Sequence, residues 1–212
     1  MSQNKTAMGL VEYAKAQLGK PYWYGTFGNT STEELYNTKR KQYPKYYTAK
    51  DFSKQYNLRV HDCIGLIKGY LWSDTHTSTP KYNSAQDKSA DGMYNASKEK
   101  GSIDTIPEIV GLLVWRKGHI GVYIGNGYVI EARGHSYGVV KTRLKDRNFT
   151  NWCKCPYITY GVTSKTEPKK TVEQVAKEVI QGKWGTGINR KNRLEKAGYD
   201  YKAVQDRVNQ LI

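Results

Sequence analysis

Hydrophobic residues follow a helical period in the first part of the chain. Residues 6–18 have apolar positions at helical spacing and end at Gly19, so they predict an amphipathic helix. Residues 63–72 have the apolar density of a buried helix, and Asp62 is a favoured cap residue that accepts hydrogen bonds from first-turn amides. Residues 89–100 predict a further helix, which a glycine ends.

From residue 109 the pattern changes to short runs rich in β-branched residues, separated by glycine and by Asn126-Gly127. The runs IVGLLVWR, HIGVYIG, YVIEARG and GVVKTRL predict an antiparallel meander. Residues 29–57 are polar, rich in Tyr and Lys and without a sustained period, so they predict an irregular insertion or short helices. Residues 1–161 therefore predict an α+β domain in which N-terminal helices pack on an antiparallel sheet.

The tail of the chain returns to a helical period after a polar segment. Residues 162–170 contain Pro168 and no apolar period, so they predict a linker. Thr171 is expected to cap a helix, and residues 189–197 and 201–211 predict two more. Residues 171–212 therefore predict a small three-helix bundle. Its first helix has the apolar stripe Val172, Val175, Ala176, Val179 and Ile180.

The chain is strongly basic, because 34 Lys and Arg residues against 19 Asp and Glu give a net charge of +15. Such a charge favours a polyanionic partner, which is nucleic acid, an anionic membrane face or an anionic cell wall. The basic residues are scattered along the chain, which argues against a specific nucleic-acid site. No segment approaches the ~20 apolar residues of a membrane span, so we expect no membrane insertion.

Three cysteines occur in the chain. Cys153 and Cys155 are one residue apart, too close for an easy disulfide, and they lack the second pair of ligands that a zinc site needs. We interpret them as structural thiols and expect no metal and no cofactor. Cys63 differs, because a thiol in the first turn of a helix beside an imidazole has its pKa lowered and can act as a nucleophile. The alternative for Cys63 is a buried structural thiol.

The histidines that could serve as the base are His61, His76, His119 and His135. His119 is favoured because it opens a strand, where a ring can face a cleft. A third group must orient that ring. If the following hairpin loop has three residues, 125–127, Gly121 lies opposite Glu131, and the carboxylate shares the face of His119. A two-residue Asn-Gly turn would send Glu131 to the other face. We predict the three-residue loop; the alternative for Glu131 is a solvated strand residue.

The motifs PYWYG, HDCIGLIKGY and GHIGVYIGNGYVIEA occur in this order and resemble the NlpC-type cell-wall peptidases. The resemblance covers about residues 6–160. It implies a papain-like fold, with Cys63 as nucleophile, His119 as general base and acid, and Glu131 as the orienting group. It also implies that Tyr24 contacts the substrate or the oxyanion, and we include Asp62 among the substrate-binding residues.

The tail is similar nearly throughout to a cell-wall-binding repeat that some phage lysozymes carry in tandem. That family is a three-helix module that recognises the disaccharide-peptide unit of the wall. The resemblance implies contacts from Trp184, Arg193, Tyr199, Asp200 and Tyr201, and for each of them a packing role is the alternative. One copy of a small module binds weakly, so self-association through it is expected.

Together these features predict a phage endolysin-like cysteine peptidase that hydrolyses an amide bond in the stem peptide of peptidoglycan. The implied bond joins D-isoglutamate or D-isoglutamine to the diamino acid. The alternatives are an N-acetylmuramoyl-L-alanine amidase, a non-catalytic wall-binding protein and a nucleic-acid binder. We expect anionic wall polymers as partners, residues 29–57 and 72–106 as walls of the cleft, and accumulation in the host cytoplasm before release to the wall, since no signal peptide is recognised.

Overall fold

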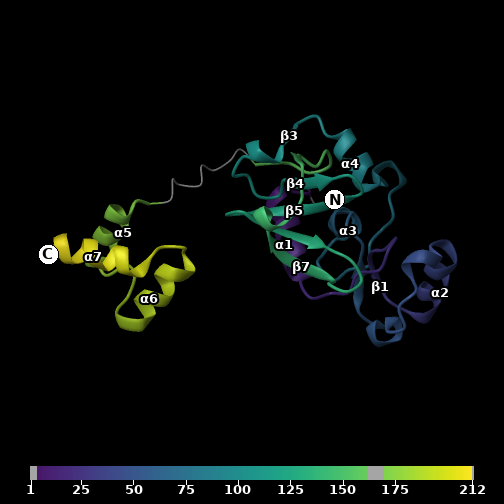
Figure 1. Ribbon diagram of the computed structural model, residues 1–212, viewed down its shortest axis with the longest axis horizontal. Coiled ribbons are helices and arrows are strands. Elements are labelled where there is room, and N and C mark those ends of the chain that lie inside the picture. The colour runs from purple at the N-terminus through teal and green to yellow at the C-terminus, as the bar shows by residue number, and fades with distance from the viewer. Residues whose placement is uncertain (1–3, 162–169, 212) are drawn as a thin grey trace. The chain divides into compact units, whose positions relative to one another are not determined.

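The computed structural model describes residues 4–161 and 170–211 and divides into two compact units, Met1–Gly161 and Val162–Ile212 (Figure 1). Most of the predicted linker, residues 162–169, lies outside the described residues. The expected class, an α+β unit followed by a small helical unit, is confirmed by the elements that each unit contains.

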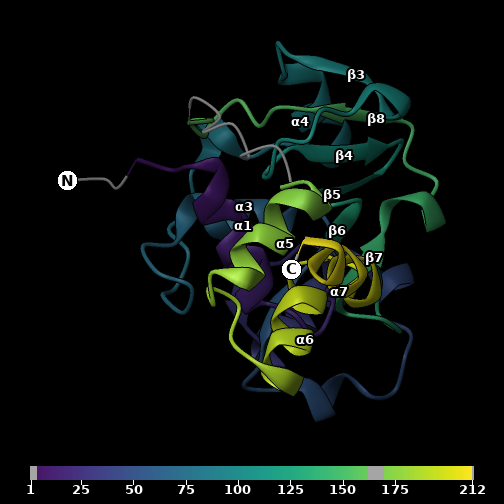
Figure 2. The same cartoon turned by 90° about the vertical axis from the view of Figure 1, so that its left-hand side faces the viewer.

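The first unit is built on a six-stranded antiparallel sheet with the strand order β3-β8-β4-β5-β6-β7 (Figure 2). Its strands are β3 Lys100–Ser102, β4 Leu113–Arg116, β5 His119–Gly125, β6 Tyr128–Ala132, β7 Val139–Arg143 and β8 Asn151–Cys153. The predicted meander is therefore confirmed as β4 to β7. Strand β8 was not predicted, and it returns to lie between β3 and β4.

Helices α1 (Ala7–Ala16) and α3 (Gly65–Trp72) pack on the sheet and form the main core with it. Leu10 of α1, Leu66 of α3 and Ile120 of β5 are all fully buried in this core. The predicted helix at 89–100 is wrong at its end, since α4 spans only Ala90–Ala96. After α4 the chain adopts an extended conformation because β3 pairs with β8, and this pairing outweighs local helix propensity.

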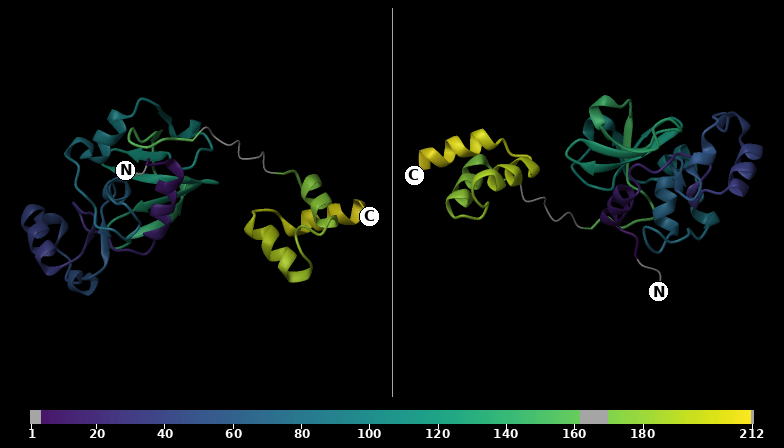
Figure 3. Two further views of the ribbon diagram at one scale, coloured as in Figure 1. Left: turned by 180° about the vertical axis from the view of Figure 1, so that it is seen from behind. Right: turned by 90° about the horizontal axis from the view of Figure 1, so that it is seen from below.

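The segment 29–57 holds a regular helix, α2 (Glu33–Gln42), as well as short turns. Figure 3 shows it as a lobe at one side of the first unit. Strands β1 (Phe27–Thr30) and β2 (Arg59–His61) pair at its base and form a two-stranded sheet that the sequence did not predict. The lobe has its own aromatic core, formed by Trp23, Tyr47, Phe52 and Val60.

The second unit consists of α5 (Val172–Ile180), α6 (Gly187–Lys196) and α7 (Tyr201–Leu211). These are the predicted helices, except that α6 begins two residues and ends one residue earlier than predicted. Thr171 and Gln174 form a capping box at the start of α5. The predicted apolar stripe of α5 is not buried at its two ends, where Val172 and Ile180 are 38% and 45% exposed. The buried core of this unit is Val175, Ala176, Val179, Leu194, Val204 and Val208. Among the described helices, none combines the length and apolarity needed to cross a membrane.

His61 at the end of β2 is a neutral ring locked in the first unit. It is fully buried, and its Nε2 lies 3.0 Å from the hydroxyl of Tyr13. Its Nδ1 has no hydrogen-bond partner among the described residues. Burial, together with the nearby charge of Arg59, lowers the pKa of His61 to about 3.

This environment makes the stability of the first unit depend on pH. Between about pH 6.5 and pH 3 the unfolded chain binds a proton at His61 that the folded chain does not bind. The free energy of unfolding should therefore fall by about 1.4 kcal/mol for each pH unit lowered through this window. Urea titrations of the parent and of His61→Asn at several pH values test this, because the variant should lose that part of the slope. Equal slopes in the two proteins would contradict the prediction.

Candidate active site

The predicted register between β5 and β6 is present. Val122 pairs with Ile130 and Tyr123 with Val129, which sets Gly121 opposite Glu131. A Cβ at Gly121 would lie 2.8 Å from Cγ1 of Val129 and 3.2 Å from the Cβ of Glu131, so glycine lets the two strands approach here. Glu131 and His119 consequently share a face of the sheet, and Glu131 Oε2 lies 2.6 Å from His119 Nε2.

The device that produces this register differs from the predicted three-residue loop. The turn is the two-residue Asn126-Gly127, both with positive φ, of 53° and 71°. Gly125 pairs with Tyr128, and the register shifts between Tyr123 and Gly125. The extra residue, Ile124, is thus a bulge within β5, not part of the loop. A two-residue turn alone would reverse the face of Glu131, and the bulge restores it.

Two residues that the sequence analysis missed complete the surroundings of Glu131. Thr142 on β7 donates its hydroxyl to Oε1 at 2.8 Å. Arg147 donates from Nε to Oε1 at 2.6 Å and from Nη2 to Oε2 at 3.0 Å. No local motif marks Arg147, which reaches Glu131 only because β7 and the turn after it fold back over the carboxylate.

The carboxylate of Glu131 is ionised although its side chain is fully buried. Burial alone would raise its pKa, but hydrogen bonds from His119, Arg147 and Thr142 outweigh burial and hold the pKa at about 2. Glu131 accepts from Nε2 of the His119 ring, the ring's one hydrogen-bond partner among the described residues. The Nδ1 atom is therefore the nitrogen that can accept a proton from a neighbour.

Cys63 lies in the tight turn that leads into α3. Asp62 holds this turn, since its Oδ1 accepts from the Gly65 amide at 2.6 Å and its Oδ2 from the Gly25 amide at 2.8 Å. The predicted bond from Asp62 to a first-turn amide is present, but α3 begins at Gly65, two residues later than predicted, with Ile64 at the cap position. Cys63 therefore lies before the helix and not in its first turn. A side chain at Gly65 would lie 1.8 Å from the carbonyl oxygen of Thr26, so the close approach of the two segments requires glycine.

The thiol of Cys63 lies against the beginning of β5. Burial raises the pKa of Cys63 to about 12, and the charge of Asp62 adds to the rise. The backbone N–H groups of Ile64 and of Ile120, the residue after His119, lower the pKa of Cys63, but by less than burial raises it. The expected lowering of this pKa by the helix terminus is therefore wrong, because desolvation of the thiolate exceeds the stabilisation by nearby amides.

Cys63 opens onto a pocket of about 700 Å³. Segment 29–57 contributes Lys39, Gln42 and Tyr43 to its wall, and segment 72–106 contributes residues from Tyr82 to Asp91. The expectation that both segments line the cleft is confirmed. Tyr24 also lines this pocket, with its ring stacked on Tyr46 at a centroid distance of 3.7 Å. Burial and the neighbouring hydroxyl of Tyr46 raise the pKa of Tyr24 to about 12, so its phenol stays protonated.

The other histidines and cysteines occupy separate positions. His76 is exposed, and His135 pairs with Asp51 at 2.7 Å. Cys153 and Cys155 are buried free thiols, and burial raises the pKa of each to about 12. Within residues 4–161 and 170–211, no group of three or more His, Cys, Asp or Glu side chains is arranged to hold a metal ion.

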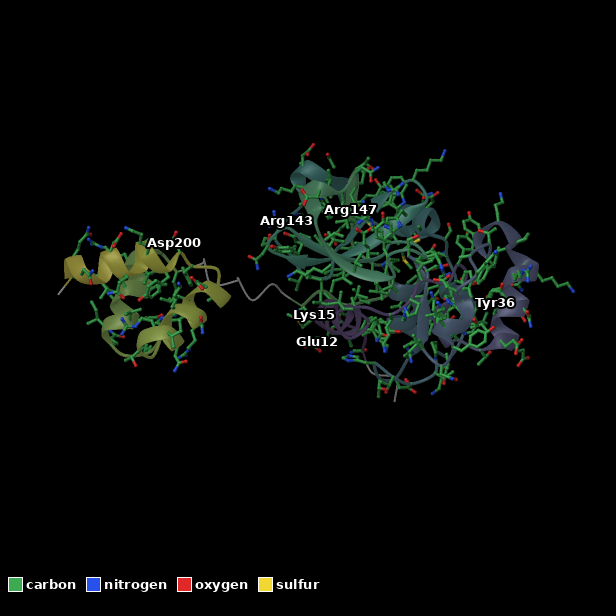
Figure 4. The ribbon with its side chains drawn as sticks, turned by 60° about the horizontal axis from the view of Figure 1, so that its bottom comes forward. Glu12, Lys15, Tyr36, Arg143, Arg147 and Asp200 are labelled. Atoms are coloured by element: carbon green, nitrogen blue, oxygen red, sulfur yellow. The ribbon has the colours of Figure 1, made fainter. Side chains whose placement is uncertain are left out.

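In the second unit the predicted contact residues fall into two groups. Trp184, Tyr199 and Tyr201 are partly buried and pack on the core of the three helices, which agrees with a packing role. Arg193 and Asp200 are exposed, and the Asp200 carboxylate accepts from the Ala203 amide at 3.0 Å at the start of α7 (Figure 4).

Comparison with known proteins supports the predicted tail. Residues 173–212 match the CW_7 repeat family. Over 42 residues the chain is 55% identical to a lysozyme of Streptococcus phage Cp-7. That match covers 20% of this chain and 12% of the phage lysozyme. The expectation of a C-terminal lysozyme-type repeat is confirmed.

The chain also has similarity to solved structures. The peptidoglycan hydrolase RipB from Mycobacterium tuberculosis is 19% identical with a TM-score of 0.42, over 73% of this chain and 67% of that one. NlpC1 from Trichomonas vaginalis is 16% identical with a TM-score of 0.44, over 75% and 46%. The P60 domain of an antigen from M. avium subspecies paratuberculosis is 18% identical with a TM-score of 0.43, over 70% and 93%.

The raised pKa of Cys63 has a direct chemical consequence in the free protein. Because only the thiolate reacts and the pKa of Cys63 is about 12, the rate at which iodoacetamide alkylates Cys63 should rise with pH without reaching a plateau below that pKa. Mass spectrometry of the peptide that contains Cys63 separates this reaction from that of the buried thiols. A rate that reaches its plateau below pH 7 would instead show a preformed thiolate.

The bidentate pair between Arg147 and Glu131 should contribute strongly to stability. Arg147→Met would leave a buried carboxylate with fewer donors, so we expect the free energy of unfolding to fall by about 3 kcal/mol. Arg143 lies near Arg147 and borders the same surface hollow, but it is exposed (Figure 4). Arg143→Met is the matched control and should change stability by less than about 0.5 kcal/mol. Similar losses in both variants, measured by urea denaturation, would rule out this role for the pair.

Proposed function

We propose that the chain is a cysteine-dependent peptidoglycan hydrolase that cleaves an amide bond in the stem peptide of the bacterial cell wall. One observation carries the proposal. A buried, ionised Glu131 fixes the ring of His119 at the start of β5, and the thiol of Cys63 lies against the next residue of that strand. A thiol, an imidazole and an orienting carboxylate are the parts that acyl transfer needs.

The reaction begins with proton transfer, because the thiol is protonated in the free enzyme. With Nε2 held by Glu131, His119 takes the proton of Cys63 at Nδ1 as the sulfur attacks the amide carbonyl. The negative charge of Glu131 stabilises the imidazolium that forms. The backbone N–H of Cys63 stabilises the oxyanion, and His119 then gives its proton to the leaving amine. Water, activated by His119, hydrolyses the thioester and restores the free thiol.

The second unit would hold the enzyme on its substrate. The CW_7 match and the identity to a phage lysozyme support a wall-binding role for residues 173–212 and an endolysin-like role for the chain. The net charge of +15 would add attraction to anionic wall polymers. We also propose self-association through this single repeat, since two linked modules bind a polymer more tightly than one.

Within this proposal the scissile bond is the one between the D-isoglutamyl residue and the diamino acid. Digestion of purified peptidoglycan tests both the activity and the bond. The parent should release products with a new amino terminus on the diamino acid, whereas an N-acetylmuramoyl-L-alanine amidase would release a new terminus on L-alanine. Mass spectrometry of the products distinguishes the two.

The role of Cys63 is tested in the same assay. Cys63→Ser should lose about a thousandfold or more of the hydrolysis rate and keep its binding to intact walls. Cys155→Ala changes a buried thiol away from the site and serves as the control that retains hydrolysis. Hydrolysis that survives in Cys63→Ser would refute Cys63 as the nucleophile. A parent that releases no amino termini would refute the proposed enzyme and leave a wall-binding protein.

A further inference from the structure

The pocket beside Cys63 contains charged side chains of both signs, and their partners differ. Its carboxylates are those of Asp62, Asp87 and Asp91. Asp62 accepts from two backbone amides, as described above. Asp87 accepts from Lys68 and from the hydroxyl of Tyr82, the latter at 2.9 Å. Asp91 accepts from the Trp115 indole at 2.9 Å and the Gly118 amide at 2.7 Å. All the carboxylates of the pocket are thus already bonded to donors of the protein.

The lysine ammonium groups of the pocket are less completely paired than its carboxylates. Lys68 is paired with Asp87, but Lys39 and Lys88 form no ion pair within the part of the chain that the structure describes. Lys39 is half-buried and makes one long hydrogen bond, to Gln42 at 3.3 Å. Burial lowers its pKa, since desolvation opposes its charge. The charges of Asp62 and Asp87 act on Lys39 from a distance, and its ammonium lies 5.7 Å from the centroid of the Tyr43 ring. A half-buried cation that forms no ion pair gains when an anion binds directly to it.

Lys39 and Lys88 come from different segments of the pocket wall. Lys39 lies on α2 in segment 29–57, and Lys88 lies just before α4 in segment 72–106. Both line the same pocket as Cys63, so a substrate that presents its carbonyl to the thiol lies within reach of this wall. A D-isoglutamyl residue linked through its side chain has a free α-carboxylate beside the proposed bond, and a diamino acid with two carboxyl groups has a second. Each of these groups loses its charge when it is present as the amide.

We propose that Lys39 and Lys88 form a carboxylate-binding subsite, so that the enzyme prefers stem peptides with free carboxylates to amidated ones. This inference rests on the proposed function and names the form of the substrate. A hydrogen bond from an ammonium group to a carboxylate joins two charged groups, whereas one to an amide oxygen has a neutral acceptor. The bond to the carboxylate is therefore the stronger one. The preference thus comes from two segments that line the pocket of Cys63 and take no part in the chemistry.

The test uses two pairs of synthetic stem peptides. The first pair differs only in a carboxylate or an amide on the D-isoglutamyl residue, and the second only in that group on the diamino acid. The parent should hydrolyse the carboxylate form of at least one pair with a kcat/KM about tenfold higher. Lys39→Gln or Lys88→Gln should reduce this ratio to below about threefold, and the double variant should abolish it. Lys41→Gln, on the exposed surface of α2 and outside the pocket, is the matched control and should keep the ratio.

Binding to Cys63→Ala, measured by calorimetry, separates this proposal from the proposed chemistry. The dissociation constants should show the same preference for the carboxylate form, and that preference should disappear when Lys39 and Lys88 are also replaced. Equal affinity for both forms, or no measurable binding of either, would overturn the subsite. Discrimination in binding without hydrolysis by the parent would overturn the hydrolase and leave the subsite standing.

Discussion

A negative charge buried beneath the sheet is the constraint on which the site depends. Glu131 has no exposed surface, so its charge persists only while donors surround it. Those donors come from β5, from β7 and from the turn after β7. Strand pairing and site geometry are therefore one requirement, because a register slip of a single residue would move the carboxylate to the opposite face and separate it from all of them.

In contrast to the carboxylate of Glu131, the thiol of Cys63 is held in its neutral form. Few donors surround Cys63, and burial with the charge of Asp62 keeps it protonated. The resting site thus combines an ionised carboxylate with a neutral thiol. The imidazole of His119, whose Nε2 is held by Glu131, presents Nδ1 as the atom that takes up a proton during the reaction. Such a resting state protects the sulfur from oxidants and electrophiles, which react with thiolates.

Sequence reasoning found the parts of this arrangement that local patterns encode. The helix after Asp62, the meander and the face shared by His119 and Glu131 all follow from periodicity and turn chemistry. What it missed depends on contacts between distant segments. Arg147 lies 16 residues from Glu131 in an ordinary basic stretch, and β8 becomes a strand only by pairing with β3 and β4. The pKa of Cys63 depends on burial that a helix pattern does not specify, and the bulge at Ile124 leaves no mark beside the obvious Asn-Gly turn.

The lobe formed by segment 29–57 is packed around Trp23, Tyr47, Phe52 and Val60, apart from the main core. Its helix α2 has no buried residue of its own, yet it supplies part of the wall beside the thiol. Substitutions at the positions of α2 that line the pocket therefore leave the packing of the sheet and the hydrogen bonds of Glu131 unchanged. Under the proposed function, evolution can alter which wall chemotype is accepted through one face of a single helix, and an engineer could exchange that helix for the same purpose.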